Sequence, residues 1–169
     1  MDPIVEKIIA KLGLLPHPIE GGFFVETYRS TFSIPAETLG VHPSSRSLAT
    51  AIYYLLTPHT VSEMHLLPTD EIFHFYAGDP VEMLQLWPDG SSKKIVLGNQ
   101  ILQGHMPQLV VPGHVWQGSW LLPGGNYALL GATMAPGFDY QDYIRGNRSK
   151  LTEQYPSHRD LIAHLTPGQ

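Results

Sequence analysis

The 169-residue chain contains no cysteine, which excludes a disulfide scaffold, a thiolate metal site and a cysteine nucleophile. Charged residues make up only 15% of the sequence, compared with ~25% in an average soluble domain. The formal net charge is −5 and there is no run of basic residues, so we expect no nucleic-acid polymer as a partner. No apolar run approaches the ~20 residues of a membrane-spanning helix, so we expect no membrane partner either.

Turn-forming residues, by contrast, are abundant, with 16 glycines and 15 prolines. Both residues disfavour helix interiors, so the composition argues against a helical bundle and favours short strands joined by turns. Hydrophobic residues supply 43% of the chain, which is enough for a sizeable core, and the length fits one domain. Residues 1–13 carry charges throughout and lack the apolar core of a signal peptide, so we expect a cytoplasmic protein.

Apolar periodicity predicts helices near both ends of the chain and strands between them. One helix is expected over residues 3–12, capped by Asp2 and ended by Gly13, and another begins after Ser157. Alternating or β-prone segments predict strands at 23–29, 47–57, 63–67, 71–77, 81–87, 93–97, 108–111, 116–122, 127–134 and 138–143. Short strands at this regular spacing are typical of an antiparallel sandwich or barrel.

A histidine and a carboxylate lie close together in the segment 65–78. His65 is expected at the end of one strand and Glu71 at the start of the next, so a hairpin-like return would place them side by side in the mouth of a barrel. Such a pair can ligate a metal, or it can form an acid–base pair whose pKa values shift in an apolar cavity. An acid flanked by Ile72 and Phe73 is not expected on a solvated face.

Further candidate pocket residues lie on neighbouring predicted strands. Strict alternation places Glu26 and Tyr28 on one strand face and directs Arg29 to the other. Gln117 begins another strand and could donate a hydrogen bond inside the pocket. The aromatic residues expected in the core, where they could also stack on a flat ligand, are Phe73, Phe75 and Phe138.

Other titratable residues are expected to lie outside the pocket. His74 is opposed to Glu71 by strand alternation, which predicts a structural position such as a subunit interface. Asp139 and Asp142 are expected to be turn or edge carboxylates. The histidines that we expect at the surface are His42, His59, His105, His114, His158 and His164.

The spacing of these residues resembles the two-part signature of the cupin superfamily, G-x5-H-x-H-x3-4-E-x6-G and G-x5-P-x-G-x2-H-x3-N. His65 and Glu71 fall on the first His and on the Glu of the first part, and Pro112 falls on the Pro of the second. Two positions that hold metal-ligating histidines in the signature carry Leu67 and Gln117 here. These departures argue against a tightly bound transition metal, so we expect no cofactor beyond a weakly bound divalent metal.

Longer strings resemble the cupin 5 family of RmlC-like jelly rolls. They extend from about Leu14 to about Leu151 and include HPIEGGFFVETYRS, SEMHLLPTDEIFHFYAGDPVEMLQLWPDG, VVPGHVWQGSWL and PGFDYQDY. The resemblance implies a double-stranded β-helix, the jelly-roll cupin barrel, in a single domain over residues 1–169 with a barrel core of about 20–145. It also implies a pocket inside the barrel and a homodimer, but no established reaction.

Three functions are open for such a pocket. The first is metal-free binding of a small polar or heterocyclic molecule, similar to a sugar nucleotide or a nucleobase, with isomerase or epimerase activity as its catalytic form. RmlC-like epimerases, which the chain resembles, use a pocket histidine as base and a tyrosine as acid. Here His65, oriented by Glu71, would abstract a proton α to a carbonyl. The candidate acids are Tyr28, Tyr53 and Tyr140.

The second function is that of a metal-dependent oxygenase or isomerase. Its ligands would be His65, Glu71 and either Gln117 or His74, in a site that keeps open positions for substrate. The third is a non-catalytic ligand binder or sensor, in which His65, Glu71 and Gln117 form hydrogen bonds to a flat heterocycle inside an aromatic-lined barrel.

Overall fold

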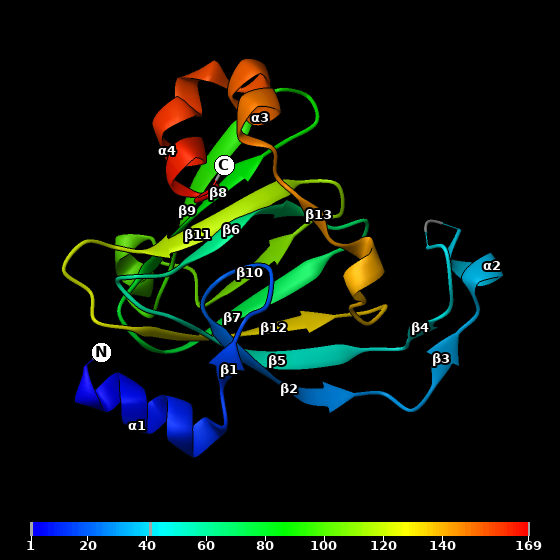
Figure 1. Ribbon diagram of the computed structural model, residues 1–169, viewed down its shortest axis with the longest axis horizontal. Helices are drawn as coiled ribbons and strands as arrows, with labels where there is room; N and C mark the ends of the chain where they lie inside the picture. Colours follow the sequence, from blue (N-terminus) through cyan, green and yellow to red (C-terminus); the bar gives the residue numbers. More distant parts are fainter. Residues whose placement is uncertain (1, 41, 169) are drawn as a thin grey trace.

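The computed structural model describes residues 2–40 and 42–168, and it consists of two facing antiparallel sheets (Figure 1). The six strands of the larger sheet, in spatial order, are β1 (Leu15–Pro16), β2 (Phe23–Arg29), β5 (Thr50–Leu56), β12 (Ala128–Met134), β7 (Glu71–Gly78) and β10 (Gln108–Val111). The five strands of the smaller sheet are β13 (Ile144–Arg145), β6 (Val61–Leu66), β11 (Trp116–Leu121), β8 (Val81–Leu86) and β9 (Ser92–Leu97). A separate short ribbon pairs β3 (Ser33–Ile34) with β4 (Arg46–Ser47).

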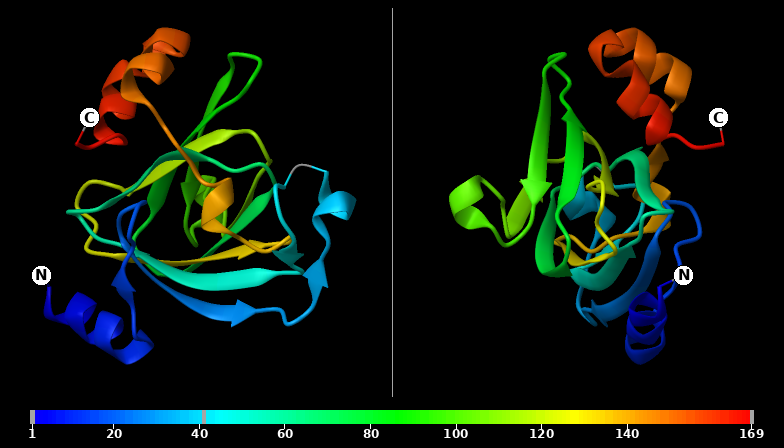
Figure 2. Two further views of the ribbon diagram at one scale, coloured as in Figure 1. Left: turned by 45° about the vertical axis from the view of Figure 1, so that its right-hand side comes forward. Right: turned by 90° about the vertical axis from the view of Figure 1, so that its left-hand side faces the viewer.

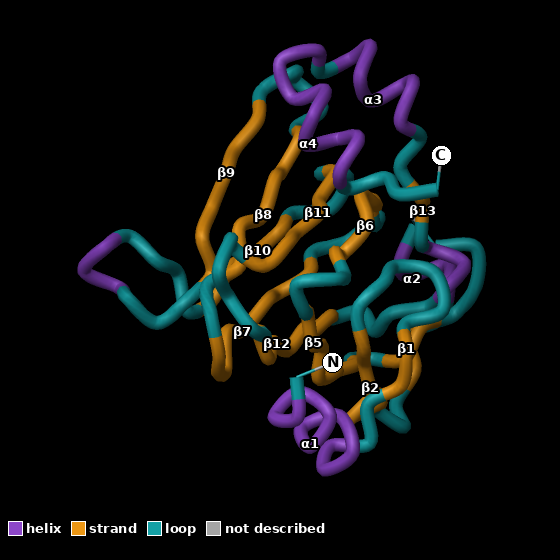
Figure 3. Tube along the Cα trace, turned by 60° about the vertical axis from the view of Figure 1, so that its left-hand side comes forward, coloured by secondary structure: helices purple, strands orange, loops and turns teal. Residues whose placement is uncertain are grey.

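Short helices cover the outer faces of the sandwich and lie in its loops. They are α1 (Pro3–Leu12), α2 (Ala36–Leu39), α3 (Arg148–Gln154) and α4 (Arg159–His164), with 3₁₀ turns η1 (Ile101–Gln103), η2 (Tyr140–Asp142) and η3 (Pro156–His158). Figure 2 shows α1 outside the larger sheet and the C-terminal helices outside the smaller one. The segment containing η1, between β9 and β10, projects from the body of the molecule (Figure 3). Within the described ranges, none of the helices is long and apolar enough to cross a membrane.

Three apolar clusters hold these layers together. The main core fills the space between the sheets and includes Tyr54, Phe73, Met83 and Leu130. A second cluster joins α3 and α4 to the outer face of the smaller sheet, where Met64, Leu84 and Leu86 point outward because neighbouring residues alternate between the two faces. In a third cluster, around Val5, Leu14 and Leu55, α1 packs against the larger sheet.

The predicted fold class and the N-terminal helix are confirmed. The side chain of Asp2 accepts a hydrogen bond from the backbone N–H of Ile4 at 2.6 Å, and Gly13 ends α1 with a left-handed φ of 67°. The alternation of apolar and polar residues therefore identified an antiparallel β fold bracketed by helices, since apolar residues lie on the covered face of each strand.

The predicted strand at 138–143 is wrong. Asp139 accepts a hydrogen bond from the backbone N–H of Gln141 at 2.9 Å, and its own carbonyl accepts one from Asp142 at 3.0 Å. This aspartate turn starts η2, so the segment curls over the end of the sandwich although its residues alternate like a strand. Helices α2 and α3 were not predicted, because both are short and lack a long apolar stripe.

A glycine pair shapes the loop before β2. Gly21 and Gly22 have φ values of 88° and 69°, and a Cβ atom at Gly21 would collide with the carbonyl of Val61. The pair lets the loop press against β6, where the backbone N–H of Glu63 donates to the carbonyl of Glu20 at 2.8 Å. The loop is thereby fixed at one end of the sandwich, and its side chains enter the space between the sheets.

Candidate functional site

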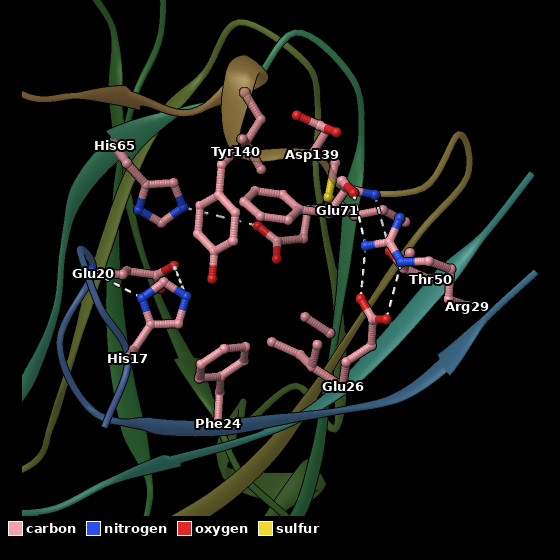
Figure 4. A pocket seen from close by; sticks show the side chains of 15 residues that line it. His17, Glu20, Phe24, Glu26, Arg29, Thr50, His65, Glu71, Asp139 and Tyr140 are labelled. Carbon is pink, nitrogen blue, oxygen red and sulfur yellow. Dashed lines mark hydrogen bonds and ion pairs between the residues drawn. The ribbon is translucent and has the colours of Figure 1, made fainter. Parts of the chain in front are cut away.

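A cavity of about 380 Å³ opens between the two sheets at the end covered by η2 (Figure 4). Its apolar lining comes from Phe24, Ile52, Leu67, Ala132, Met134 and Phe138. Its polar lining comes from His17, Glu20, Glu26, Arg29, Thr50, His65, Glu71, Asp139 and Tyr140. Polar groups therefore lie at both ends of the cavity, with apolar side chains between them.

The deep end is formed by His65 from β6 and Glu71 from β7. Their side chains are buried, and Nε2 of His65 lies 3.9 Å from an oxygen of Glu71. The other ring nitrogen, Nδ1, is 2.7 Å from the backbone carbonyl of Glu63 and therefore carries a proton that it donates there. Tyr143 stacks on the imidazole at a centroid distance of 5.0 Å. The ring is thus held with Nε2 facing the cavity.

Two carboxylates determine the protonation of His65. Burial by itself would lower the pKa of this imidazole, because desolvation penalises the charged form. The negative charges of Glu20 and Glu71 outweigh that effect and raise the pKa of His65 to about 9. His65 is therefore mainly an imidazolium at neutral pH, with a proton on Nε2 that it can donate into the cavity.

The loop before β2 contributes His17 and Glu20. The backbone N–H of Glu20 donates to Nδ1 of His17 at 2.9 Å, so that nitrogen must be unprotonated. Burial lowers the pKa of His17, despite the opposing charge of Glu20, which keeps the ring neutral. Glu20 in turn accepts a hydrogen bond from the hydroxyl of Ser62 at 2.5 Å.

The mouth of the cavity carries the ion pair between Arg29 and Glu26. Arg29 donates from Nε and Nη2 to the two carboxylate oxygens of Glu26 at 2.9 and 2.7 Å, and from Nη2 to the carbonyl of Phe138 at 3.1 Å. Glu26 is opposite Ile52 in β5 and Arg29 is opposite Thr50, so both side chains are on the cavity face.

The expected pocket position of Tyr28 is wrong, and so is the expected outward position of Arg29. The register between β2 and β5 shifts between Glu26 and Tyr28, so one extra residue enters β2 there. This β-bulge reverses the alternation, which directs Arg29 into the cavity and turns Tyr28 outward with 55% of its surface exposed.

The segment containing η2 covers the cavity and is anchored by a buried charge cluster. Phe138, Asp139 and Tyr140 line the cavity, whereas Asp142 is buried and accepts two hydrogen bonds from Arg46 at 2.7 and 2.6 Å. The sequence suggested only turn or edge roles for Asp139 and Asp142.

The expected surface position of His42 is also wrong, because this side chain is buried with Nδ1 3.0 Å from Asp142. His42 lies within the turn-rich stretch 33–46, which is expected to be exposed, and only the fold brings that stretch against η2. Burial would raise the pKa of Asp142, but hydrogen bonds from Arg46 and His42 hold it below its usual value.

Four predicted ligand-binding residues do not line the cavity. Phe73 is in the main core and Phe75 packs against that core, while Tyr53 lies against Tyr76 on the outer face of the larger sheet. Gln117 is buried behind the lining and donates a hydrogen bond to Glu71 at 2.8 Å.

His74 is opposite Gly131, outside the cavity, and stacks on Tyr76. The residues of the prediction that the structure brings together around the cavity are Glu26, His65, Glu71, Phe138 and Tyr140.

Sequence reasoning missed His17, Glu20 and Arg29 as cavity residues. His17 and Glu20 fall within the string HPIEGG. Its glycine pair indicates a tight loop and could have drawn attention to these two residues. Nothing in the sequence of β2 indicates the bulge that turns Arg29 inward.

The cavity contains histidines and carboxylates, but at its deep end it lacks two of the donors that the metal site of the signature requires. Leu67 lines it at the position where the signature has a histidine, and Gln117 makes its hydrogen bond to Glu71 instead of facing an ion. Over residues 2–40 and 42–168, no three histidine, aspartate or glutamate side chains are placed to hold a metal ion together. The expectation of a metal-free pocket stays a prediction.

Two facing antiparallel sheets that enclose a polar cavity, with a histidine from β6 of one sheet and a glutamate from β7 of the other at its deep end, define a cupin domain. The chain matches the model of the Cupin_5 family of the cupin superfamily (DUF985) over residues 6–144, and it belongs to that family. It is 31% identical over 148 residues to the uncharacterized protein YML079W of Saccharomyces cerevisiae, a match that covers 82% of this chain and 73% of the yeast protein.

Solved structures support the same assignment. A hypothetical protein from Leishmania major superposes with a TM-score of 0.85 at 31% identity, covering 95% of this chain and 97% of that one. Protein SO0799 from Shewanella oneidensis also gives a TM-score of 0.85 at 31% identity, with 97% and 98% covered. Oxalate decarboxylase from Bacillus subtilis has a TM-score of 0.55 at 13% identity and covers 92% of this chain but 37% of its own, a likeness of fold alone.

Proposed function

We propose that the protein binds a small polar or heterocyclic molecule in this cavity and catalyses a metal-independent isomerisation or epimerisation. The observation that carries the proposal is the fixed, buried imidazole of His65, whose Nε2 faces the cavity 3.9 Å from the carboxylate of Glu71. A proton donor and a proton acceptor are thus held at the deep end, where an apolar lining strengthens their electrostatic interactions.

The raised pKa favours His65 as the acid, whereas the sequence suggested it as the base. In the reaction that we propose, the carboxylate of Glu71 takes a proton from the carbon next to a substrate carbonyl. The Nε2–H of His65 stabilises the negative charge that develops on the carbonyl oxygen. Return of a proton to the other face of that carbon, from the hydroxyl of Tyr140, would invert its configuration. No redox change is involved, so no oxidant or reductant is needed.

The size of the cavity limits the ligand. At about 380 Å³, it lies near the lower end of the range of ~300–1,000 Å³ for small-molecule sites. A single ring with its substituents, such as a monosaccharide or a nucleobase, fits this volume better than a complete sugar nucleotide does.

Exchange of substrate protons with solvent tests the proposal. Ring-sized carbonyl compounds are incubated with the protein in D₂O, and NMR follows loss of the proton next to the carbonyl. We expect exchange with the wild type and none with His65→Gln or Glu71→Gln. Exchange that survives in His65→Gln would remove His65 from the reaction. Binding without exchange in the wild type would instead favour the ligand binder or sensor.

We also propose that the protein is a homodimer, as its resemblance to the cupin 5 family implies. Tyr28, Tyr76 and Val110 are about half exposed on the outer face of the larger sheet, and such side chains suit a subunit contact. Light scattering should give twice the chain mass of 18.8 kDa, and a monomer mass at micromolar concentration would contradict this expectation.

A further inference from the structure

The cavity contains more carboxylates than cations. Four acidic side chains line it, which are those of Glu20, Glu26, Glu71 and Asp139. The positive charges are those of Arg29 and of His65 in its protonated form. Even when His65 is counted as charged, the lining has an excess of two negative charges. Low-dielectric walls keep such an excess from being screened as it would be in water.

Both cations already have carboxylate partners. Arg29 uses Nε and Nη2 for its two hydrogen bonds to Glu26, so much of its positive charge is compensated before a ligand binds. His65 faces Glu71 at 3.9 Å and also feels the charge of Glu20. An anionic ligand would therefore meet two neutralised cations and an uncompensated negative charge.

Glu20 offers a ligand one of its carboxylate oxygens. Its Oε1 accepts the hydroxyl hydrogen of Ser62, but its Oε2 lies 3.9 Å from Nε2 of His17, which is too far for a hydrogen bond. His17 is neutral, so it does not compensate the charge of Glu20. One oxygen of this largely buried carboxylate thus faces the cavity.

Aromatic rings surround the same space. His17 and Phe24 meet edge to face with centroids 4.5 Å apart, and Phe138 and Tyr140 meet at 5.1 Å. Figure 4 shows Phe24 and Tyr140 facing the open space in front of Glu20. Ring faces attract organic cations, and protein sites for ammonium groups combine such rings with carboxylates.

We propose that the ligand is a small organic cation, a protonated amine, amidine or guanidine on a compact skeleton, with its charged group against Glu20. This inference rests on the proposed binding of a small molecule in the cavity and adds that this molecule is positively charged. A ligand that also has a carbonyl group would leave His65 and Glu71 free for proton transfer.

Three probes of nearly equal shape and different charge test the inference: benzamidine, benzamide and benzoate at neutral pH. NMR titration, with the ring signals of Phe24 and Tyr140 as reporters, gives the affinity of each probe in the cavity. We expect benzamidine to bind about tenfold more tightly than benzamide, because a hydrogen bond to a charged group is the stronger one, and benzoate to bind most weakly. Glu20→Gln keeps an oxygen that can accept the hydrogen bond from Ser62. In this variant, benzamidine should no longer bind more tightly than benzamide. The exposed helix variant Glu6→Gln is the matched control and should retain it.

Equal or tighter binding of benzamide or benzoate would overturn the inference and leave a small-molecule cavity standing. Failure of benzamidine to shift the reporters would overturn it as well. Retention of the tenfold preference in Glu20→Gln would overturn the role of Glu20, provided that thermal unfolding shows the variant to be folded. Cation binding without exchange of substrate protons would instead uphold the charge class and contradict the proposed isomerase.

Discussion

Arg46 and Asp142 form a buried, two-point ion pair, with hydrogen bonds of 2.7 and 2.6 Å between guanidinium and carboxylate. The pair joins β4 to η2, which are 96 residues apart in the chain. Arg46 also donates to the carbonyl and hydroxyl of Ser44, so the guanidinium is held from both sides. Because Tyr140 and its neighbours line the cavity from this same segment, the ion pair positions one wall of the site.

We therefore predict that Arg46→Met destabilises the protein by about 3–5 kcal/mol, since it leaves the carboxylate of Asp142 buried without its main partner. The double variant with Asp142→Leu should lose less than the sum of the two single changes. Urea unfolding measures both effects. Hydrogen exchange in residues 138–143 should also accelerate in Arg46→Met, and unchanged exchange there would contradict the positioning role.

The raised pKa of His65 predicts a pH dependence of stability. The folded state holds this proton up to a pH of about 9, whereas the unfolded chain releases it near 6.5. The stabilisation is therefore complete below 6.5 and is lost as the pH rises through 9, by a total of about 3 kcal/mol. The lowered pKa of His17 acts in the opposite direction and only below 6.5, so it does not affect this window.

Urea unfolding between these two pH values checks the sign. The free energy of unfolding should fall with rising pH in the wild type and in the exposed control His59→Gln, and it should fall much less in His65→Gln. A flat profile in the wild type would show that His65 is neutral in the folded protein.

The bulge in β2 predicts different effects for two tyrosines. Tyr140 lines the cavity, whereas Tyr28 points away from it, although strict alternation suggested a pocket position for Tyr28. Tyr140→Phe should slow inversion of the substrate centre at least about tenfold, while exchange through Glu71 persists, as expected on loss of the group that returns a proton to the other face. Tyr28→Phe should leave inversion unchanged. The reverse order would show that the bulge does not persist in solution.

The two vacant signature positions predict a gain of metal binding. Leu67 lines the cavity beside His65 and Glu71, and Gln117 contacts Glu71 directly. Leu67→His combined with Gln117→His would add two imidazoles to the existing histidine and carboxylate, a donor set that suits divalent transition metals.

Calorimetric titration with Ni²⁺ should show stoichiometric binding to the double variant and at least about tenfold weaker binding to the wild type. Equal affinity in the two proteins would mean that the wild-type residues already form a metal site.

The deep end of the site was largely predictable from the sequence, and its mouth was not. His65 and Glu71 lie on consecutive strands joined by a short turn, so they stay close together although β6 and β7 belong to different sheets and do not form the expected hairpin. Glu20 and Arg29 reach the cavity through a glycine-bounded loop and a bulge, two irregularities that do not follow from apolar periodicity. Tyr140 arrives from a segment whose alternation resembled a strand but whose aspartate turn made it curl.

The sequence by itself determined an antiparallel β fold, its bracketing helices and the pair of residues at the deep end of the cavity. Each of these depends on local patterns: alternation along strands, helix caps and the spacing between neighbouring strands. Only the tertiary structure decided the charge of the cavity and the protonation of its histidine. Those properties are sums over groups from β2, β6, β7, two loops and η2, and electrostatic interactions depend on distances in space that residues far apart in the chain acquire only on folding.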